Sequence, residues 1–395
     1  MTVKINIINS SNSYEWDSYV YSNPKGTLYH LYEWKTIIEK TYSHDTYYLI
    51  AKKYIDQKIT SPKHQNIKNM NQKRRNVFLD ENPTRKVVGI LPLVHLRHLF
   101  FGNSLISIPF FDFGGLLADD KNISKALLSE AMKLGERLKV ERIELRQTEP
   151  IPNIAVLGTK QFKIKYEGSV GNWIIRNSQR KVLMFLKLPR SSEILLTSFR
   201  SKLRSQIKKP LKEGLYSRVG GLELLEDFYR VFLINMRDLG SPVHSKNLIR
   251  NVLDEFVDKS KIFIVYSNSK PLACSLTVGF KDILTNPWAS ALRKSSHLSP
   301  NMLLYWSMLS YACDNGYQYF NFGRSSPGGG TFKFKEQWGA KPIPLHWFYF
   351  SLDGQSMHTQ DPEKSRFCKA IHYWQKLPVP VTKILGPQIR RHIGL

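Results

Sequence analysis

Residues 321–340, NFGRSSPGGGTFKFKEQWGA, carry the pattern that decides the expected fold. An apolar, aromatic run ends at Arg324, a Pro-Gly-Gly-Gly turn follows, and a short helix-like segment then carries aromatic residues and lysines. A strand, a glycine turn and a helix N-terminus in this order aim backbone N–H groups at an anion or an oxyanion. The stretch therefore predicts the edge of an active site near the C-terminal end of the chain.

The turn and the helix after it offer two kinds of candidate site residue. Gly328, Gly329 and Gly330 would let a substrate carbonyl or phosphate approach the backbone closely. Lys335 follows Phe334 one turn into the helix and would place positive charge beside a tetrahedral oxyanion or a phosphate. The alternatives are an ordinary turn and a solvated lysine, and the residues alone leave both open.

Two charged residues at strand ends complete the candidate site. Arg324, with Ser325 beside it, ends the aromatic strand and would bind a phosphate or carboxylate through its guanidinium. Asp112 ends an apolar run just before two glycines, so it is a candidate general base or a carboxylate that holds a substrate amine. An aspartate that only caps a loop is the alternative for Asp112.

Strands and helices are expected to recur in one order along the chain. Residues 47–51 and 86–96 predict a hairpin around a polar, basic insertion at about 53–85, followed by a strand at 106–113, a helix that begins at Asn122 or Ser124 and runs to about 139, and a strand at 142–146. Residues 262–266, 272–280, 283–289, 299–313 and 317–322 repeat the order hairpin, strand, helix, strand. This predicts an α+β fold with mixed sheets, built from two copies of one unit.

The expected domains follow from this repeat. They are 1–170, 171–350, and a basic tail at 351–395 that packs on the body. A strand at 185–188 and a basic helix at 198–214, interrupted near Pro210, are expected between the two units. Chance recurrence of a common unit is the alternative to duplication.

The net charge of +26 over 395 residues predicts a polyanionic partner: RNA, an anionic membrane face or a phosphate-bearing substrate, with no DNA partner expected. Arg204 and Lys208 lie in the densest basic stretch, at 200–218. Three cysteines without a CxxC pair, no apolar leader and no apolar run of about 18 residues predict a cytoplasmic protein. The tail could also rest on the inner face of the cytoplasmic membrane.

Several classes of enzyme are not supported by the motifs present. The chain has no metal-ligand spacing, no GxSxG elbow, no GxxxxGK[ST] loop and no GxGxxG after a first strand. Metal catalysis, a serine nucleophile, nucleoside-triphosphate hydrolysis and a Rossmann enzyme are therefore not expected.

Long strings of the chain resemble the FemAB-like proteins encoded near exosortase and exopolysaccharide loci. The strings are FGRS, then glycines, then FKFKEQWG at 332–339 and PIPLHW at 342–347, with further similar stretches at 101–115, 201–215, 239–245 and 377–387. This resemblance implies tandem domains of the Gcn5-related N-acyltransferase (GNAT) fold, with a BioF2-like acetyltransferase domain. Family members usually have Lys and Thr where this chain has Ser326 and Gly329, and the insertion at 53–85 is not typical of them.

The resemblance also implies an activity. In the related Fem peptidyltransferases an aminoacyl group passes from a charged tRNA to an amine of a peptidoglycan precursor. Their Phe-Lys pair beside the active site matches Phe334 and Lys335, which implies that Lys335 aids the transfer of the acyl group.

The function expected from the residues and the resemblance together is acyl transfer by direct aminolysis to an amine of a cell-envelope or exopolysaccharide precursor. Aminoacyl-tRNA is the expected donor, and no permanently bound cofactor and no metal are expected. One alternative is an acyl-CoA-dependent N-acyltransferase that acts on an amino sugar. The other is a non-catalytic, polyanion-binding protein that kept the fold.

Overall fold

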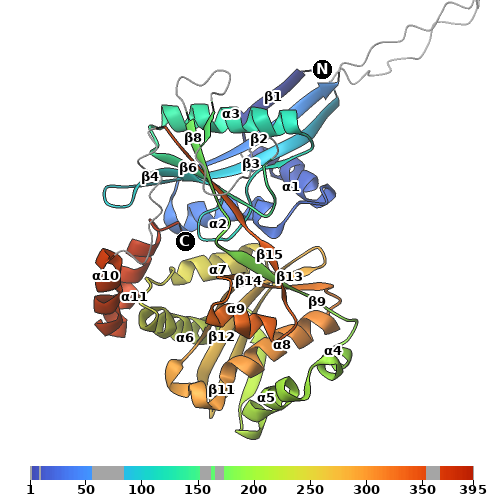
Figure 1. Ribbon diagram of the computed structural model, residues 1–395, viewed down its shortest axis with the longest axis vertical. Helices are drawn as coiled ribbons and strands as arrows, with labels where there is room; N and C mark the ends of the chain where they lie inside the picture. Colours follow the sequence, from blue (N-terminus) through green and yellow to red (C-terminus); the bar gives the residue numbers. More distant parts are fainter. Residues whose placement is uncertain are drawn as a thin grey trace, which may run out of the picture.

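The computed structural model describes residues 2–8, 10–55, 84–151, 162–164, 173–352 and 365–394. Two lobes, each built on one mixed β-sheet, lie one above the other in Figure 1. This confirms the predicted α+β fold with two mixed sheets. The predicted insertion at 53–85 joins the ends of a hairpin, and its residues 56–83 lie outside the described residues.

The first sheet has the strand order β1-β2-β3-β4-β6-β16-β8-β7, with β5 paired to β3. Helices α1 (Ser13–Ser22) and α2 (Glu33–Tyr42) cover one face, and α3 (Lys121–Arg137) covers the other. Side chains alternate along the central strands, so Tyr48 and Ile50 face α1 and α2, whereas Leu49 and Ala51 face α3. The strands are β1 (Thr2–Ile7), β2 (Thr46–Ile55), β3 (Thr84–His98), β4 (Gly102–Ile106), β5 (Leu117–Ala118), β6 (Arg142–Gln147), β7 (Phe162–Ile164), β8 (Trp173–Ser178) and β16 (His346–Ser351).

The second sheet has the order β10-β11-β12-β13-β14-β9-β15. Helices α6 (Leu225–Asp238) and α7 (Lys246–Glu255) lie on the face toward the first lobe, and α4 (Ser192–Ser198), α5 (Ser201–Lys212) and α8 (Pro300–Asp314) cover the other face. The short helix α9 (Gly330–Glu336) follows β14. The strands are β9 (Val182–Lys187), β10 (Tyr216–Gly220), β11 (Ser260–Ser267), β12 (Lys270–Phe280), β13 (Ile283–Ala291), β14 (Tyr319–Ser325) and β15 (Lys341–Pro344).

The repeat expected from the sequence is present in both lobes. In the first lobe, β2 and β3 form an antiparallel hairpin, β4 follows, and α3 leads to β6, which runs parallel to β4. In the second lobe, β11 and β12 form the hairpin, β13 follows, and α8 leads to β14, which runs parallel to β13. Each lobe therefore holds one parallel pair, joined by a helix crossover as such pairs require.

The chain passes between the lobes more than once. Strands β8 and β16 fall inside the expected second domain, 171–350, but both are hydrogen-bonded into the first sheet, where β16 lies between β6 and β8. The backbone N–H of Leu345 donates to the carbonyl of Lys181 at 3.0 Å, where both segments cross between the sheets. The expected domain boundary at residue 170 therefore stays a prediction. The first sheet contains β8 and β16, which come after that residue.

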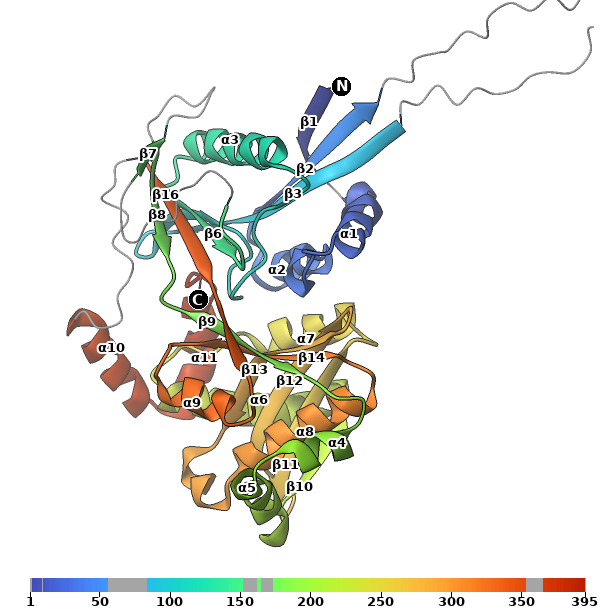
Figure 2. The same ribbon diagram turned by 45° about the vertical axis from the view of Figure 1, so that its right-hand side comes forward.

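One hydrophobic core joins the two lobes. The ring of Trp34 on α2 lies 4.3 Å from Phe111 of the first lobe and 5.1 Å from Phe256, which follows α7. Phe111 in turn lies 5.6 Å from Trp288 on β13. Figure 2 shows α2 above α7 at this boundary. The relative position of the lobes is therefore set by buried aromatic rings.

The strand expected at 106–113 is wrong beyond its first residue, because β4 ends at Ile106. The chain then turns, with positive φ at Ile108 (49°) and Phe110 (75°). The carbonyl of Phe111 accepts a hydrogen bond from Arg146 Nη1 at 2.6 Å, and the N–H of Phe110 donates to the carbonyl of Gly394 at 2.6 Å. In this loop these hydrogen bonds replace the backbone pairing that a neighbouring strand would provide.

Two expected helix boundaries also differ. Asp120, and not Asn122 or Ser124, caps α3, since its side chain accepts the N–H groups of Asn122 at 2.7 Å and Ile123 at 2.9 Å. The break in the basic helix falls between α4 and α5, where Phe199 is extended and buried, and Pro210 is held inside α5.

The C-terminal segment forms α10 (Ser365–Lys376) and α11 (Val379–Arg390), which lie alongside α6 (Figure 1). Arg237 Nη1 on α6 donates to the carbonyl of Leu377 at 3.2 Å, and Val243 lies against Gly386. Ile384 points to solvent and is 71% exposed. Among the described residues, no helix combines the length and apolar composition that crossing a membrane requires.

Candidate active site

A cavity of about 310 Å³ opens where β13 and β14 separate. The two strands pair in parallel over only three residue pairs, the last of them Thr285 with Asn321. Beyond Asn321 the pairing of β14 with β13 ends, and the register of β14 against β9 shifts before it resumes at Arg324. The cavity lies at this point, and residues of both lobes and of α11 line it: Tyr29, Phe110, Phe111, Asp112, Phe113, Thr285, Asn286, Pro287, Trp288, Ala289, Tyr305, Asn321, Phe322, Gly323, Arg324, Thr331, Lys335 and Arg390.

Lys335 reaches the cavity from α9 and fixes the end of β14. Gly323 has φ +74°, a conformation that favours glycine, and lies where the register of β14 against β9 shifts. Lys335 Nζ donates to the carbonyls of Gly323 and Arg324 at 3.1 and 2.8 Å. An ammonium has three donors, so one remains beyond these two bonds. Because Lys335 lines the cavity, that donor is available to a bound group.

Burial changes the acidity of this lysine. Lys335 is 7% exposed, and desolvation, opposed by Asp112 and assisted by Arg324, lowers its pKa to about 8. Its ammonium and amine forms are therefore both populated near pH 8. Perturbed groups of this kind cluster at functional sites.

Asp112 brings a carboxylate from the first lobe to the end of β14. Its Oδ1 lies 3.4 Å from Nε of Arg324, and its Oδ2 accepts the backbone N–H of Arg324 at 3.2 Å. Trp347 on β16 donates its indole N–H to the carbonyl of Asp112 at 3.0 Å, and its ring lies 5.2 Å from the guanidinium carbon of Arg324. The two charged residues expected from strand ends are thus side by side across the lobe boundary.

Three polar atoms at this edge are buried without a hydrogen-bond partner among the described residues. They are Nδ2 of Asn321, Nη1 of Arg324 and Oγ of Ser325. Asn321 and Arg324 line the cavity, whereas Ser325 lies one residue beyond its lining. Since buried polar groups are nearly always paired, the two free donors at the cavity indicate a polar ligand.

A second cavity of about 310 Å³ adjoins the first. Phe113, Thr285 and Asn321 line both of them. The second cavity extends on the other side of these residues toward the segment 24–28 and β9, with Lys25 and Glu149 paired at 2.6 Å at its edge. Two substrates could therefore approach the same strand ends from two sides.

The glycine turn is placed less centrally than the sequence suggested. Gly328, Gly329 and Gly330 are absent from the linings of the cavities described above, although Thr331 is present. Gly328 has φ +75°, as the turn requires. Phe334 packs edge-on against Tyr305, with ring centroids 5.0 Å apart, so it anchors α9 on α8. A role of the turn's N–H groups in binding stays a prediction.

Gly330→Ala tests whether a substrate approaches the backbone of this turn closely, because alanine keeps the N–H group and adds only a Cβ. A Cβ at Gly330 meets no protein atom within 4 Å, and the position begins α9. We expect the free energy of unfolding to change by less than about 0.5 kcal/mol, with kcat/KM for acyl transfer unchanged. Chemical denaturation and steady-state kinetics measure the two. A large loss of activity in a stable protein would instead show that the substrate approaches the backbone here.

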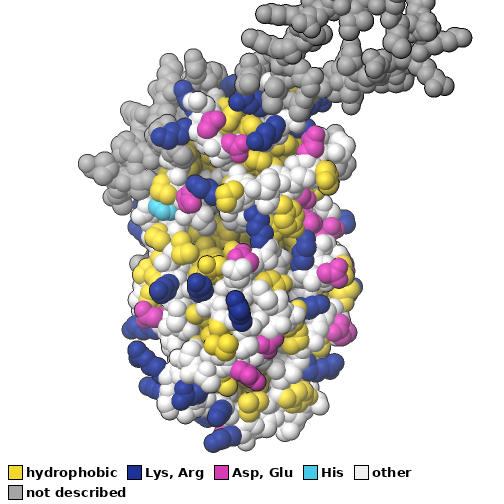
Figure 3. Space-filling view, turned by 90° about the vertical axis from the view of Figure 1, so that its right-hand side faces the viewer, with side chains coloured by type: hydrophobic (Ala, Val, Ile, Leu, Met, Phe, Trp, Pro, Cys, Tyr) yellow, Lys and Arg dark blue, Asp and Glu magenta, His cyan; other side chains and the backbone are white. Residues whose placement is uncertain are grey.

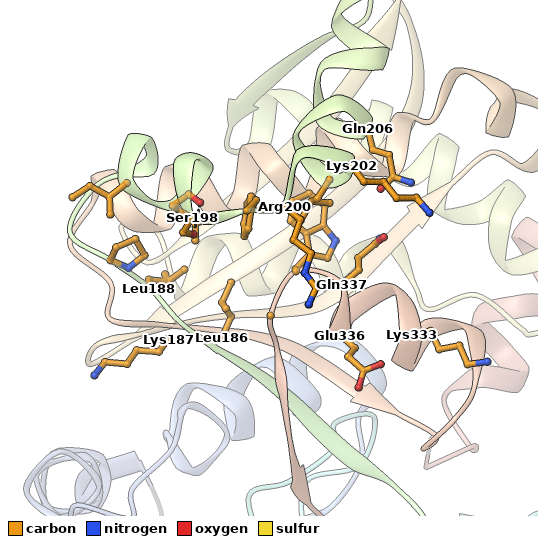
Figure 4. Close-up of a pocket in the computed structure, with 17 residues that line it drawn as sticks. Leu186, Lys187, Leu188, Ser198, Arg200, Lys202, Gln206, Lys333, Glu336 and Gln337 are labelled. Atoms are coloured by element: carbon orange, nitrogen blue, oxygen red, sulfur yellow. Dashed lines mark hydrogen bonds between the residues drawn. The ribbon is translucent and has the colours of Figure 1, made fainter.

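The basic stretch around α5 lies beside a larger, open cavity of about 950 Å³ (Figure 4). Arg200 and Lys202 line it, and Lys187 and Lys333 point outward at its opposite edges. The predicted residues Arg204 and Lys208 do not line it. Arg204 Nη1 donates to the carbonyl of Phe199 at 2.6 Å, and Lys208 is exposed. Helix α9 lies between this larger cavity and the cavity between β13 and β14. Lys333 and Glu336 line the larger cavity, and Lys335 lines the one between the strands.

On the face in Figure 3, Lys and Arg side chains are scattered over both lobes, with Asp and Glu side chains among them. No cluster of His, Cys, Asp and Glu among the described residues has the arrangement of a metal site. Cys274 and Cys313 are buried as free thiols.

Sequence reasoning missed several residues of the site. Tyr29, Trp288 and Asn321 line the cavity from three separate elements, and Arg390 comes from the C-terminal helix. Of these four residues, only Asn321 had a local sequence signal, because it lies directly before the FGRS string. The others are brought together by the packing of the lobes, which no local pattern shows.

Comparison with known proteins identifies a domain in the second lobe and a similar overall fold. Residues 197–336 match a family model described as "Acetyltransferase (GNAT) domain". No match was found among curated proteins. A solved structure titled "Crystal structure of FemX" has a TM-score of 0.58 at 15% identity and covers 87% of this chain and 96% of its own. A conserved protein of unknown function from Bacteroides thetaiotaomicron VPI-5482 has a TM-score of 0.50 at 10% identity, covering 89% and 100%.

A tandem GNAT protein from the clavulanic acid biosynthesis pathway has a TM-score of 0.49 at 10% identity, covering 89% and 98%. The domain match covers the second lobe from α4 to α9 and includes Arg324 and Lys335. The likeness to FemX extends the shared fold to both lobes. Residues 197–336 thus form an acyltransferase domain of the GNAT type, and the chain as a whole has the two-lobed fold seen in FemX.

Proposed function

We propose that this acyltransferase transfers an acyl or aminoacyl group to an amine of a cell-envelope or exopolysaccharide precursor. The supporting observation is Lys335, a buried ammonium with two fixed hydrogen bonds and one spare donor, in a cavity next to Asp112. The finer resemblance to the exosortase-associated FemAB-like proteins supports the envelope precursor as acceptor. Aminoacyl-tRNA is the proposed donor, and acyl-CoA with an amino-sugar acceptor is the alternative.

The reaction needs no covalent enzyme intermediate. The acceptor amine attacks the donor carbonyl carbon, a C–N bond forms, and the carbonyl electron pair moves to oxygen. Lys335 donates its third N–H to that oxyanion. When the intermediate collapses, the bond to the ribose oxygen of tRNA, or to the sulfur of CoA, breaks, and the proton lost by the amine goes to the leaving group.

Asp112 is proposed to hold the amine. Its carboxylate is fixed by the backbone N–H and the guanidinium of Arg324. A carboxylate oriented in this way accepts a hydrogen bond from an incoming ammonium or amine and receives its proton in passing. The adjoining cavity is also lined by Thr285 and Asn321, and it supports a path by which a second substrate reaches Asp112 and Lys335. Holding the two substrates close together contributes to the rate.

The basic surface near α5 is proposed to guide a phosphate-bearing substrate, for which tRNA is one candidate. Arg200 and Lys202 line the larger cavity. Within the described residues, neither side chain forms an ion pair. Glu336 also lines this cavity, but Lys and Arg residues outnumber it, and an excess of positive charge around an opening raises the local concentration of an anionic partner. Peripheral contact of α10 and α11 with an anionic membrane stays a prediction.

The donor is tested with purified full-length protein and precursors extracted from cells. Labelled aminoacyl-tRNA and labelled acetyl-CoA are supplied separately, and transfer of label to the precursor is followed by mass spectrometry. Transfer from charged tRNA supports the proposal, and transfer from acetyl-CoA alone supports the alternative. Absence of transfer from both, in a folded protein that binds polyanions, would favour the non-catalytic alternative.

The pH dependence of kcat should reveal which form of Lys335 acts. Because its pKa is lowered to about 8, an ammonium that stabilises an oxyanion is lost as the pH rises through 8, so kcat should fall there. A neutral lysine acting as base would make kcat rise over the same range. In Lys335→Arg the fall should move to higher pH, since a guanidinium stays protonated.

The titration of Lys335 does not itself destabilise the fold over this range. The unfolded chain binds more protons at this lysine between pH 8 and its ordinary pKa of 10.5, so this group makes stability increase with pH there. Thermal melts at each pH, measured beside kcat from pH 6 to 10, separate the two effects.

A further inference from the structure

Arg390, at the end of α11, completes the cavity from a part of the chain outside both sheets. The segment that follows it is tied to the first lobe. Arg391 donates to the carbonyl of Tyr42, His44 Nε2 contacts the carbonyl of Arg391 at 2.8 Å, and the carbonyl of Gly394 accepts from Phe110. The C-terminal helix is therefore held in place at the site by contacts on both sides of the lobe boundary.

The guanidinium of Arg390 is anchored by a neutral group. Its Nε donates to Nε2 of His244 at 3.0 Å, and Nδ1 of His244 lies 3.1 Å from the hydroxyl of Tyr42. His244 is 1% exposed, and burial together with Arg390 holds its pKa well below 6.5. A neutral imidazole that accepts at Nε2 carries its proton on Nδ1 and donates it to Tyr42. The anchor orients Arg390 but does not neutralise it.

The charges around the cavity do not balance. Its charged lining consists of Arg324, Lys335 and Arg390 against the single carboxylate of Asp112, an excess of two positive charges. The neighbouring Arg146 is already paired with Glu144 at 2.8 Å. Within the described residues, no carboxylate forms an ion pair with Arg390. Burial, with Arg324 and Arg146 nearby, lowers the pKa of Arg390 to about 10.

A cavity with an uncompensated charge is costly unless its ligand supplies the opposite charge. Arg324 and Arg390 come from different elements and line one space, and Nη1 of Arg324 is buried without a partner. Two guanidinium groups suit a phosphate, which offers three acceptor oxygens and up to two negative charges. A carboxylate would leave one of the two positive charges unmatched.

We propose that Arg390 and Arg324 hold a phosphate group of a substrate in this cavity, so that the C-terminal helix is part of the binding site. The proposal extends the proposed function by naming one chemical group of its substrate. It also gives α11 a role in binding that its position in the sequence, beyond the GNAT-type domain, does not suggest.

Binding of inorganic phosphate and pyrophosphate to the purified full-length protein tests this without any acyl transfer. Calorimetry at constant ionic strength compares the natural chain with Arg390→Gln, Arg390→Lys and Lys383→Gln, the last an exposed lysine on the same helix. We expect saturable binding that is about 10- to 100-fold weaker in Arg390→Gln, as loss of a charged hydrogen-bonding partner predicts. Arg390→Lys should keep part of the affinity, and Lys383→Gln should keep all of it.

Three results would overturn the proposal. The first is phosphate binding that Arg390→Gln leaves unchanged, and the second is no phosphate binding at all. The third is acetate binding as tightly as phosphate, which would make this a carboxylate site. Circular dichroism checks that Arg390→Gln is folded, and if it is not, Arg324→Gln takes its place. Failure of phosphate binding with intact acyl transfer would reject this inference alone, whereas phosphate binding without any transfer would reject only the proposed function.

Discussion

Replacing Lys335 by methionine is expected to lower kcat for acyl transfer by about 10²- to 10³-fold, the usual effect of removing one oxyanion donor. Methionine keeps an unbranched apolar stem out to Cε but lacks the ammonium group, and with it the charge and all three donors. Steady-state kinetics with the donor found to be active measures the effect. KM should change less than kcat, because the lost interaction is made mainly with the oxyanion.

Lys333→Met is the matched control for this prediction. Lys333 lies two residues earlier on α9, is exposed, and borders the larger cavity on the other side of the helix. Its loss should leave kcat close to that of the natural chain. Since Lys335 also fixes the carbonyls of Gly323 and Arg324, denaturation of both variants must show that α9 and β14 are intact. Equal activity of a folded Lys335→Met protein would remove Lys335 from the chemistry.

Trp34→Ala is expected to destabilise both lobes together, by about 3–5 kcal/mol. Trp34 is fully buried, packs on Phe111 and Phe256 across the lobe boundary, and donates its indole N–H to the carbonyl of Leu28 at 2.9 Å. Its removal leaves a cavity in the core that both lobes share. Urea unfolding followed by circular dichroism and by tryptophan fluorescence should show one transition, shifted to lower urea.

The control for this second prediction is Tyr14→Ala. Tyr14 lies on α1 and is 83% exposed, so the free energy of unfolding should change by less than about 0.5 kcal/mol. Two separate transitions in Trp34→Ala, with the second lobe unfolding as in the natural chain, would contradict a common core.

The repeated order of strands and helices could be predicted because it depends on local patterns. Short apolar runs marked β2 and β3, and helical spacing of apolar residues marked α3 and α8. The same rules failed at 107–113, where the apolar residues of FFDFG suggested a strand. Those side chains are buried by packing between the lobes and not by a sheet, and the backbone pairs with Arg146 and Gly394, which are distant in sequence. Local patterns do not contain such partners.

The candidate site was predictable in part. Arg324 lies at the end of β14 as expected, whereas Asp112 was singled out as the end of a strand that the structure replaces by a loop. The structure nevertheless places Nε of Arg324 3.4 Å from Oδ1 of Asp112, 212 residues away in sequence. Lys335 was expected beside the glycine turn, but its bonds go to the carbonyls of β14. Arg390 carried no signal, because a basic residue in a basic tail is common and only the packing of α11 brings it to the cavity.

The central claim is that a carbonyl becomes briefly anionic beside Lys335 in the cavity between β13 and β14. Its most direct test is mass spectrometry of envelope polysaccharide and peptidoglycan precursors from cells that lack the protein and from cells that carry the natural chain, Lys335→Met or Lys333→Met. The account predicts the same added mass on one precursor with the natural chain and with Lys333→Met, and its absence in the other two. An added mass that persists at full level with Lys335→Met would contradict it.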